Sequence, residues 1–284
     1  EAYQTMVGQA ASLSCTGKMP VLPIDEERAM ALATILAAIV NRMADFNSIL
    51  CVHNYFGSSR IAHTFGRQAL PMVWDFAEAN PFNEGSGGWG LEAIVSAIES
   101  GDAAQDLPAT VARGSATALP WPDASFDAVI TDPPYYDNIQ YAALSDFFYV
   151  WLKRTVGHLY PEHFSSEVSP KKNEAVASPW RHKSKSESRQ AYEEMMAQSF
   201  REAHRVLKRG GQMTVVYAHK TTLGWSTLID GLRQAGFTVI EAWPLDTEMK
   251  TRVSAKNSAA LASSIFLVAR KREGTLAGSY EEEV

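Results

Sequence analysis

The chain has 284 residues, of which 46% are hydrophobic and 20% charged, enough apolar material to bury a core in one large or two small domains. Its formal net charge of -6 excludes a global positive field, so any contact with nucleic acid must come from a local basic patch. Two cysteines, Cys15 and Cys51, exclude a disulfide framework and a zinc site, and without a membrane-length apolar run we expect a cytoplasmic protein with no membrane contact.

The first 105 residues are expected to form an irregular segment, 1–24, and a mainly helical region, 25–105. Asp25 is placed to cap a helix, and acids in the first turn suit the helix dipole. Residues 29–43 are apolar nearly all round, which predicts a buried helix. Further helices are predicted over 60–78 and 91–99, with a glycine-rich loop over 80–89 between them.

Residues 106–272 alternate between strand and helix patterns, which indicates a mostly parallel sheet. The last two predicted strands follow each other too closely for a crossover helix, so we expect them to pair as an antiparallel hairpin. Residues 273–284 are expected to be a disordered tail. Strands are predicted at 110–113, 126–131, 212–218, 237–243 and 264–270, and helices at 141–154, 188–207 and 224–235.

The most informative residues, 131–136, directly follow a predicted strand and read Thr-Asp-Pro-Pro-Tyr-Tyr. The carboxylate of Asp132 and the carbonyl of Pro133 can accept both hydrogens of an exocyclic amino group on a base. Pro133 and Pro134 fix the backbone, so the turn is rigid. Tyr135 can stack on the base, as enzymes that act on flipped bases require. The alternative is a strand that ends in a proline turn with an aromatic ring packed over it.

Two further groups of residues are candidates for substrate binding. Tyr136 and Asn138 could line the base pocket, or else pack in the core and cap a helix. The polar insertion 160–190 could neutralise phosphates despite the acidic whole, and its Trp180 could stack on a base, or it could be a flexible solvated loop. Its basic residues are Lys171, Lys172, Arg181, Lys183, Lys185 and Arg189.

The order strand, Asp-Pro-Pro-Tyr, helix, Lys-Arg-Gly-Gly, strand, helix and two strands resembles the second half of class I S-adenosylmethionine-dependent methyltransferases. More narrowly, residues 132–139, 144–152 and 65–82 resemble adenine-specific DNA methylases that contain a zinc ribbon, and the likeness extends over 25–271. It implies an α/β fold with an incomplete or rearranged Rossmann-like sheet and an added N-terminal helical region. It also implies methyl transfer from S-adenosyl-L-methionine to the adenine amino group in DNA. RNA or cytosine amino groups, or a non-catalytic nucleic-acid-binding fragment, remain alternatives.

The resemblance further implies that Gly114, Ser115, Ala116 and Asp132 bind the cofactor. Many relatives carry an acid where Ser115 stands, so we expect weaker cofactor recognition there. A glycine-rich turn should hold the methionine part of the cofactor. Residues 80–88 are one candidate, and the other is an upstream part of the same parental protein, since the chain begins without methionine. The zinc-ribbon cysteines are absent from this sequence.

Overall fold

The computed structural model describes residues 25–54, 60–65, 69–74, 80, 90–103, 109–136, 139–219, 221–245 and 264–272. The chain divides into two compact units. One comprises Glu1–Ala109 with Tyr141–Lys171, and the other Thr110–Gln140 with Lys172–Val284. The predictions for 1–24, for the tail 273–284 and for the glycine-rich loop beyond Asn80 lie outside the described residues.

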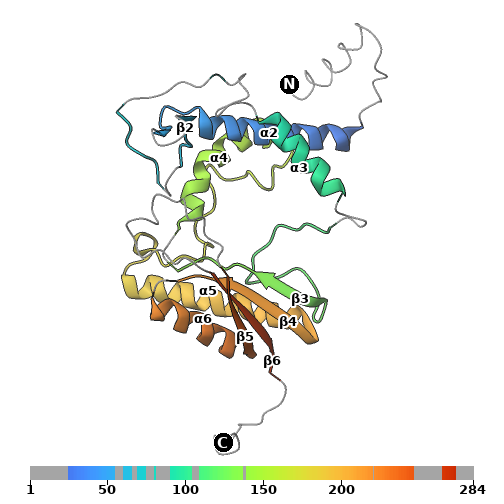
Figure 1. The fold of residues 1–284 in the computed structure, drawn as a ribbon, viewed down its shortest axis with the longest axis vertical. Helices are drawn as coiled ribbons and strands as arrows, with labels where there is room; N and C mark the ends of the chain where they lie inside the picture. The colour runs from blue at the N-terminus through green and yellow to red at the C-terminus, as the bar shows by residue number, and fades with distance from the viewer. Residues whose placement is uncertain are drawn as a thin grey trace, which may run out of the picture. The chain divides into compact units, whose positions relative to one another are not determined.

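In the first unit, helix α2 (Glu26–Phe46) packs against helix α4 (Tyr141–Val156) (Figure 1). The predicted cap is confirmed, because the Asp25 carboxylate accepts a hydrogen bond from the Arg28 amide at 2.8 Å. The sequence pattern placed α4 in the methyltransferase core, whereas its contacts are with α2. A hydrogen bond of 2.9 Å between the hydroxyls of Thr34 and Tyr160 ties α2 to the segment that follows α4.

The prediction that this first helix is buried is wrong for the described structure. Only Ala37 and Ile39 of α2 are buried, while Leu32 and Leu36 are 47% and 40% exposed. Among the described helices, α2 alone has the length and apolar composition of a membrane span. Core helices of soluble proteins and signal sequences pass the same test, so this property carries no conclusion by itself.

The helix predicted over 60–78 is also wrong for the residues that the structure describes. Strand β1 (His53–Asn54) pairs in antiparallel fashion with strand β2 (Arg60–Ile61), and residues 69–74 are not helical. The reason is a tertiary anchor: Thr64 donates to the Asp45 carbonyl from its amide at 2.8 Å and from its hydroxyl at 2.6 Å. Helix α3 (Leu91–Ala103) forms where the sequence predicted a helix.

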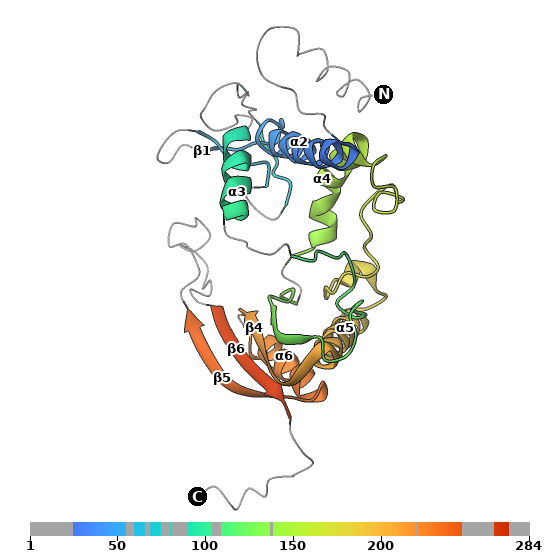
Figure 2. The same cartoon turned by 90° about the vertical axis from the view of Figure 1, so that its right-hand side faces the viewer.

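The second unit is built on a four-stranded sheet in the order β3-β4-β6-β5. Strand β3 (Phe126–Thr131) is parallel to β4 (Leu207–Tyr217). Strand β6 (Ser264–Lys271) lies between β4 and β5 (Phe237–Leu245) and is antiparallel to both, as Figure 2 shows. The predicted α/β class, with an incomplete or rearranged sheet, and the predicted antiparallel pairing of the last two strands are therefore confirmed. The expectation of a mostly parallel sheet is wrong for the described strands, because β6 pairs in antiparallel fashion with both of its neighbours. The strand predicted at 110–113 is wrong, because these residues are not in a strand.

Two helices cover the sheet and enclose its core. Helix α5 (Lys185–Val206) packs on β4, helix α6 (Thr222–Gln234) packs on β5, and the two helices pack on each other (Figure 1). Their apolar faces explain the burial, since removing such side chains from water is the main favourable contribution to folding. The core includes Tyr192, Phe200, Leu207, Met213, Val215, Leu228, Leu232, Phe237 and Ala269.

Candidate substrate and cofactor site

The Asp-Pro-Pro-Tyr motif lies at the carboxyl end of β3, as the sequence predicted. Asp132 is exposed and Pro133 is buried. Within the described part of the chain, neither the Asp132 carboxylate nor the Pro133 carbonyl has a hydrogen-bond or ion-pair partner. Two consecutive residues therefore each carry an acceptor without a described partner, on a turn whose backbone the prolines restrict.

Hydrogen bonds of Tyr192 on α5 hold the next residues of the motif. The Tyr192 hydroxyl donates to the Pro134 carbonyl at 2.7 Å and accepts from the Tyr136 amide at 3.2 Å. The Tyr136 amide also lies 3.1 Å from the Pro134 carbonyl. Burial raises the pKa of Tyr192, so its hydroxyl keeps the proton that it donates. Tyr136 adopts a left-handed φ of 51°, a strained value for a bulky residue, and these bonds hold it there.

The two motif tyrosines both contribute to the core. Tyr135 is half-buried and meets Tyr217, at the end of β4, edge to face at 5.2 Å. Tyr136 is buried against Tyr192 at 5.0 Å, and its hydroxyl accepts a hydrogen bond from Arg189 Nε. The sequence left two roles open for Tyr136, core packing and base binding. In the structure Tyr136 packs in the core and also lines a cavity. Asn138 lies outside the described residues.

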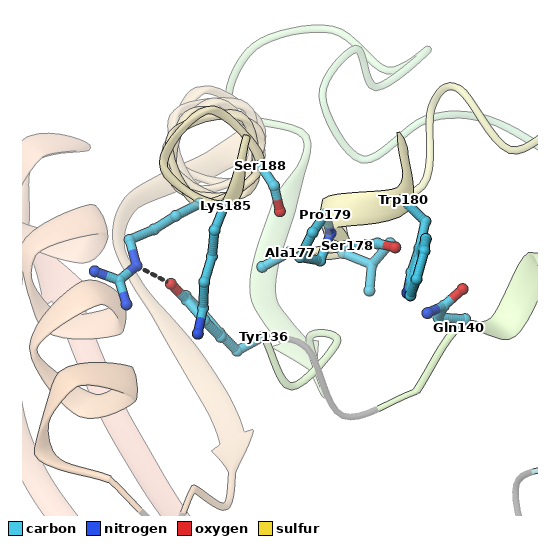
Figure 3. A pocket seen from close by; sticks show the side chains of 10 residues that line it. Tyr136, Gln140, Ala177, Ser178, Pro179, Trp180, Lys185 and Ser188 are labelled. Atoms are coloured by element: carbon cyan, nitrogen blue, oxygen red, sulfur yellow. Dashed lines mark hydrogen bonds between the residues drawn. The ribbon is translucent and has the colours of Figure 1, made fainter. Parts of the chain in front are cut away.

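That cavity adjoins the motif and has a volume of about 310 Å³ (Figure 3). Trp180 on the short 3-10 helix η2 (Pro179–Arg181) stands at its rim and is 91% exposed. Ser178 and Ser188 are buried, and their hydroxyls have no hydrogen-bond partner in the described part of the chain. The lining residues are Tyr136, Gln140, Val176, Ala177, Ser178, Pro179, Trp180, Lys185, Ser188 and Arg189.

Of the insertion residues that the sequence offered for substrate binding, Trp180, Lys185 and Arg189 line this cavity, and the other four basic residues do not. Lys171 belongs to the first unit, where its ammonium lies 2.7 Å from the Asp146 carboxylate. Burial alone would raise the pKa of Asp146, but hydrogen bonds from Lys171 and Ser169 outweigh it and lower that pKa. Arg181 forms an ion pair with Glu174, and Lys172 is exposed in the second unit.

The sequence pattern missed Gln140, Ser178 and Ser188 as lining residues. No local signal distinguishes these two serines from their neighbours in a serine-rich stretch, because their burial depends on how the loop packs against α5. Lys185 and Arg189 were predicted among the basic residues of the insertion, and because α5 begins at Lys185 the two lie four residues apart on one helix face.

The predicted cofactor residues Gly114, Ser115 and Ala116 form an exposed turn before β3. The Ser115 hydroxyl is used within this turn, where it accepts from the Thr117 amide at 3.2 Å and lies 2.7 Å from the Thr117 hydroxyl. The turn is followed by Leu119, whose amide donates to Glu202 of α5 at 2.8 Å.

A complete cradle for S-adenosyl-L-methionine is not formed by the described residues. Asp132 and the turn at Gly114 offer polar groups for one side of such a molecule, but no glycine-rich loop follows the carboxyl end of β3 or β4 among the residues described. Backbone amides in such a loop are what normally allow close approach of a cofactor. The present residues therefore fit the cofactor only in part.

No family model matches the chain, and no curated protein matches it. Among solved structures, the candidate DNA modification methylase TTHA0409 of Thermus thermophilus is 18% identical with a TM-score of 0.33, over 59% of this chain and 55% of its own. The complex of TTHA0409 with S-adenosyl-L-methionine is 17% identical with a TM-score of 0.31, over 59% of this chain and 57% of its own. The cyclase SpnF is 15% identical with a TM-score of 0.31, over 63% of this chain and 62% of its own. The chain thus spans little more than half of TTHA0409, and at these TM-scores the likenesses carry no argument about activity.

Proposed function

We propose that this chain carries the base-binding part of an S-adenosyl-L-methionine-dependent methyltransferase that acts on the exocyclic amino group of adenine in DNA. One observation carries the proposal. A carboxylate and a carbonyl, those of Asp132 and Pro133, lie next to each other without partners in the described part of the chain, at the carboxyl end of a parallel strand. Ligands of open α/β sheets bind at this edge.

The chemistry of the two acceptors suits an amino group. An exocyclic amine presents two hydrogens, and its nitrogen lone pair is conjugated into the ring. Acceptors at Asp132 and Pro133 would hold both hydrogens and favour the tetrahedral nitrogen that can attack a methyl group. The cofactor would supply that methyl group, its sulfur–methyl bond breaking as the nitrogen–methyl bond forms, and the surplus proton on nitrogen would pass to water. Positioning and electrostatics can provide the rate without a covalent intermediate. The bonds from Tyr192 fix the turn before substrate arrives.

A second candidate is a nucleic-acid-binding module without catalysis, and the partly formed cofactor site favours it. Amino groups of cytosine, or of bases in RNA, present the same two hydrogens, so they belong to the first candidate as alternative substrates. The two candidates differ in whether a methyl group is transferred.

The first test is transfer of labelled methyl groups to adenine-containing DNA and RNA by the chain and its Asp132→Ala variant. We expect the variant to lose about 100-fold or more of the rate, the effect typical of removing a group that stabilises developing charge. Asp127→Ala is the matched control. Asp127 is an exposed acid on the same strand, paired with Lys208 at 2.8 Å, and its loss should leave the rate unchanged. Near-normal transfer by Asp132→Ala would refute the mechanism.

A second measurement separates the binding module from the enzyme. 2-Aminopurine placed next to an adenine becomes more fluorescent when that adenine leaves the stack, and the adenine keeps the amino group that Asp132 would hold. An Asp132-dependent rise in fluorescence without methyl transfer would favour the binding module.

A further inference from the structure

We infer that the cavity beside Tyr136 is a subsite for a second nucleotide of the substrate strand, next to the nucleotide whose base is methylated. This inference rests on the proposed function, which assigns the target base to Asp132. Asp132, Pro133 and Tyr135 do not line the cavity, whereas the adjoining Tyr136 does. The cavity therefore takes a different part of the polynucleotide from the one that Asp132 holds. Its volume of about 310 Å³ is in the range of small ligand pockets.

One end of the cavity is suited to a base. Figure 3 shows Trp180 beside Gln140 at this end, away from Tyr136 and Lys185. The indole of Trp180 is 91% exposed, and so its ring face is open to a stacking partner. Stacking of a base on an aromatic side chain tolerates any base. The Gln140 amide can both donate to and accept from a base edge.

The other end is suited to a phosphate. Lys185 and Arg189 lie four residues apart on α5 and line the cavity from the same helix face. Arg189 Nε donates to the Tyr136 hydroxyl, which orients the guanidinium. The Lys185 ammonium and the terminal nitrogens of Arg189 have no other partner in the described part of the chain. An arginine fork and a lysine together recognise phosphate oxygens, and Lys185 opens α5, where the helix dipole adds to the attraction.

Two buried hydroxyls provide an independent sign of a ligand. The Ser178 and Ser188 side chains are 2% and 1% exposed, line the cavity, and find no hydrogen-bond partner among the described residues. Leaving a buried hydroxyl unpaired is unfavourable, and such groups in a native structure call for an explanation. Because both serines line the cavity, a rotation of either side chain toward it would let a nucleotide between Trp180 and Lys185 offer sugar or phosphate oxygens to these hydroxyls.

The six basic residues of the insertion differ in their contacts. Lys171 and Arg181 are engaged in ion pairs, and only Lys185 and Arg189 line the cavity. Lys183 is exposed, lies two residues before Lys185 and is not a lining residue, so it is a matched control. The first-turn acid Glu187 accepts from the Lys183 amide at 3.0 Å and does not line the cavity either.

The test measures binding of a fluorescein-labelled, adenine-containing single-stranded DNA oligonucleotide by anisotropy, without cofactor. We expect Trp180→Ala and Lys185→Ala each to raise the Kd about tenfold, while Lys183→Ala changes it less than about twofold. Lys185→Ala should also lower the slope of log Kd against log salt by about one, because one phosphate contact is lost.

Ser188→Ala distinguishes a ligand-binding role from a structural one. Because the variant removes a buried hydroxyl that has no partner among the described residues, its melting temperature should stay the same or rise. Its Kd for the oligonucleotide should nevertheless increase.

If Lys183→Ala and Lys185→Ala raise the Kd equally, the binding depends on diffuse charge attraction and the subsite is refuted. An unchanged Kd for Trp180→Ala would also refute it. Failure of the proposed function has a different signature. Binding that depends on Trp180 and Lys185, in a chain that transfers no methyl group, would refute the activity and support the nucleotide site. Asp132-dependent transfer with unchanged binding in these variants would refute the subsite alone.

Discussion

At the scale of single residues, the shape of the motif depends on a phenol that is distant in the sequence. Tyr192 is buried on α5, and its hydroxyl bonds to both Pro134 and Tyr136. The sequence predicted a rigid turn from the two prolines, because their effect on the backbone is local. The partner on α5 was not, because no local pattern indicates which tyrosine of the chain reaches the turn.

Tyr192→Phe should therefore destabilise the second unit. The variant removes one hydrogen bond from the Pro134 carbonyl and one acceptor from the Tyr136 amide, so we expect a loss of about 1 kcal/mol in the free energy of unfolding, measured with urea. Tyr149→Phe is the control. Its exposed hydroxyl donates to the Ser166 carbonyl at 2.8 Å, and its loss should cost less than about 0.5 kcal/mol. Equal losses in the two variants would mean that the bonds to the motif add nothing.

At the scale of elements, periodic patterns predicted most of the second unit but misplaced segments that tertiary contacts hold. The helices at 188–207 and 224–235 formed close to their predicted bounds, because their apolar faces repeat regularly over several turns. Residues 110–113 did not form a strand, and the stretch after them is fastened to α5 instead. There Arg205 donates to the Leu119 carbonyl at 3.0 Å and to the Trp121 carbonyl at 2.8 Å.

The junction between α5 and β4 also departs from its prediction. The pattern Lys-Arg-Gly-Gly predicted a helix end before a strand at 212, whereas β4 begins at Leu207, directly after the helix. Phe126 pairs with Leu207 and Ala128 pairs with Gln212, so residues 208–211 bulge out of the ladder. Gly210 has a φ of +78° in this bulge, a conformation that glycine adopts without strain.

Gly211→Ala should loosen the pairing of β3 with β4. An added Cβ would lie 2.8 Å from the Asp127 carbonyl oxygen and 2.8 Å from a methyl carbon of Leu207, and the backbone oxygen cannot move aside cheaply. We expect a loss of about 1–3 kcal/mol in urea unfolding, the usual cost of overpacking. Gly101→Ala in α3, where nothing lies within 4 Å, should instead be stabilising by up to about 1 kcal/mol. A Gly211→Ala variant as stable as the parent would show that the bulge yields easily.

At the scale of the whole molecule, the described sheet has an open edge beside the candidate site. No described strand pairs with the outer side of β3, and Ile130 on this strand is 77% exposed. Parallel strands are usually covered, and an apolar edge invites another strand. The sequence indicated the two acceptors, the Asp132 carboxylate and the Pro133 carbonyl, from one motif. It could not indicate the cavity, because the residues that line it are brought together only when the insertion packs against α5.

The open edge and the partly formed cradle lead to a prediction about the cofactor. S-adenosylhomocysteine, titrated into this chain by calorimetry, should bind only weakly, with a Kd above the micromolar range, so the transfer assays are run with cofactor in the millimolar range. The Ser115 hydroxyl is uncharged and already engaged by Thr117, so it offers a ligand little. Ser115→Asp places a charged acceptor at the same exposed turn, and if that turn faces the cofactor the variant should bind more tightly than the parent chain. Micromolar binding by the parent chain would contradict the prediction and place the cradle in residues beyond those described.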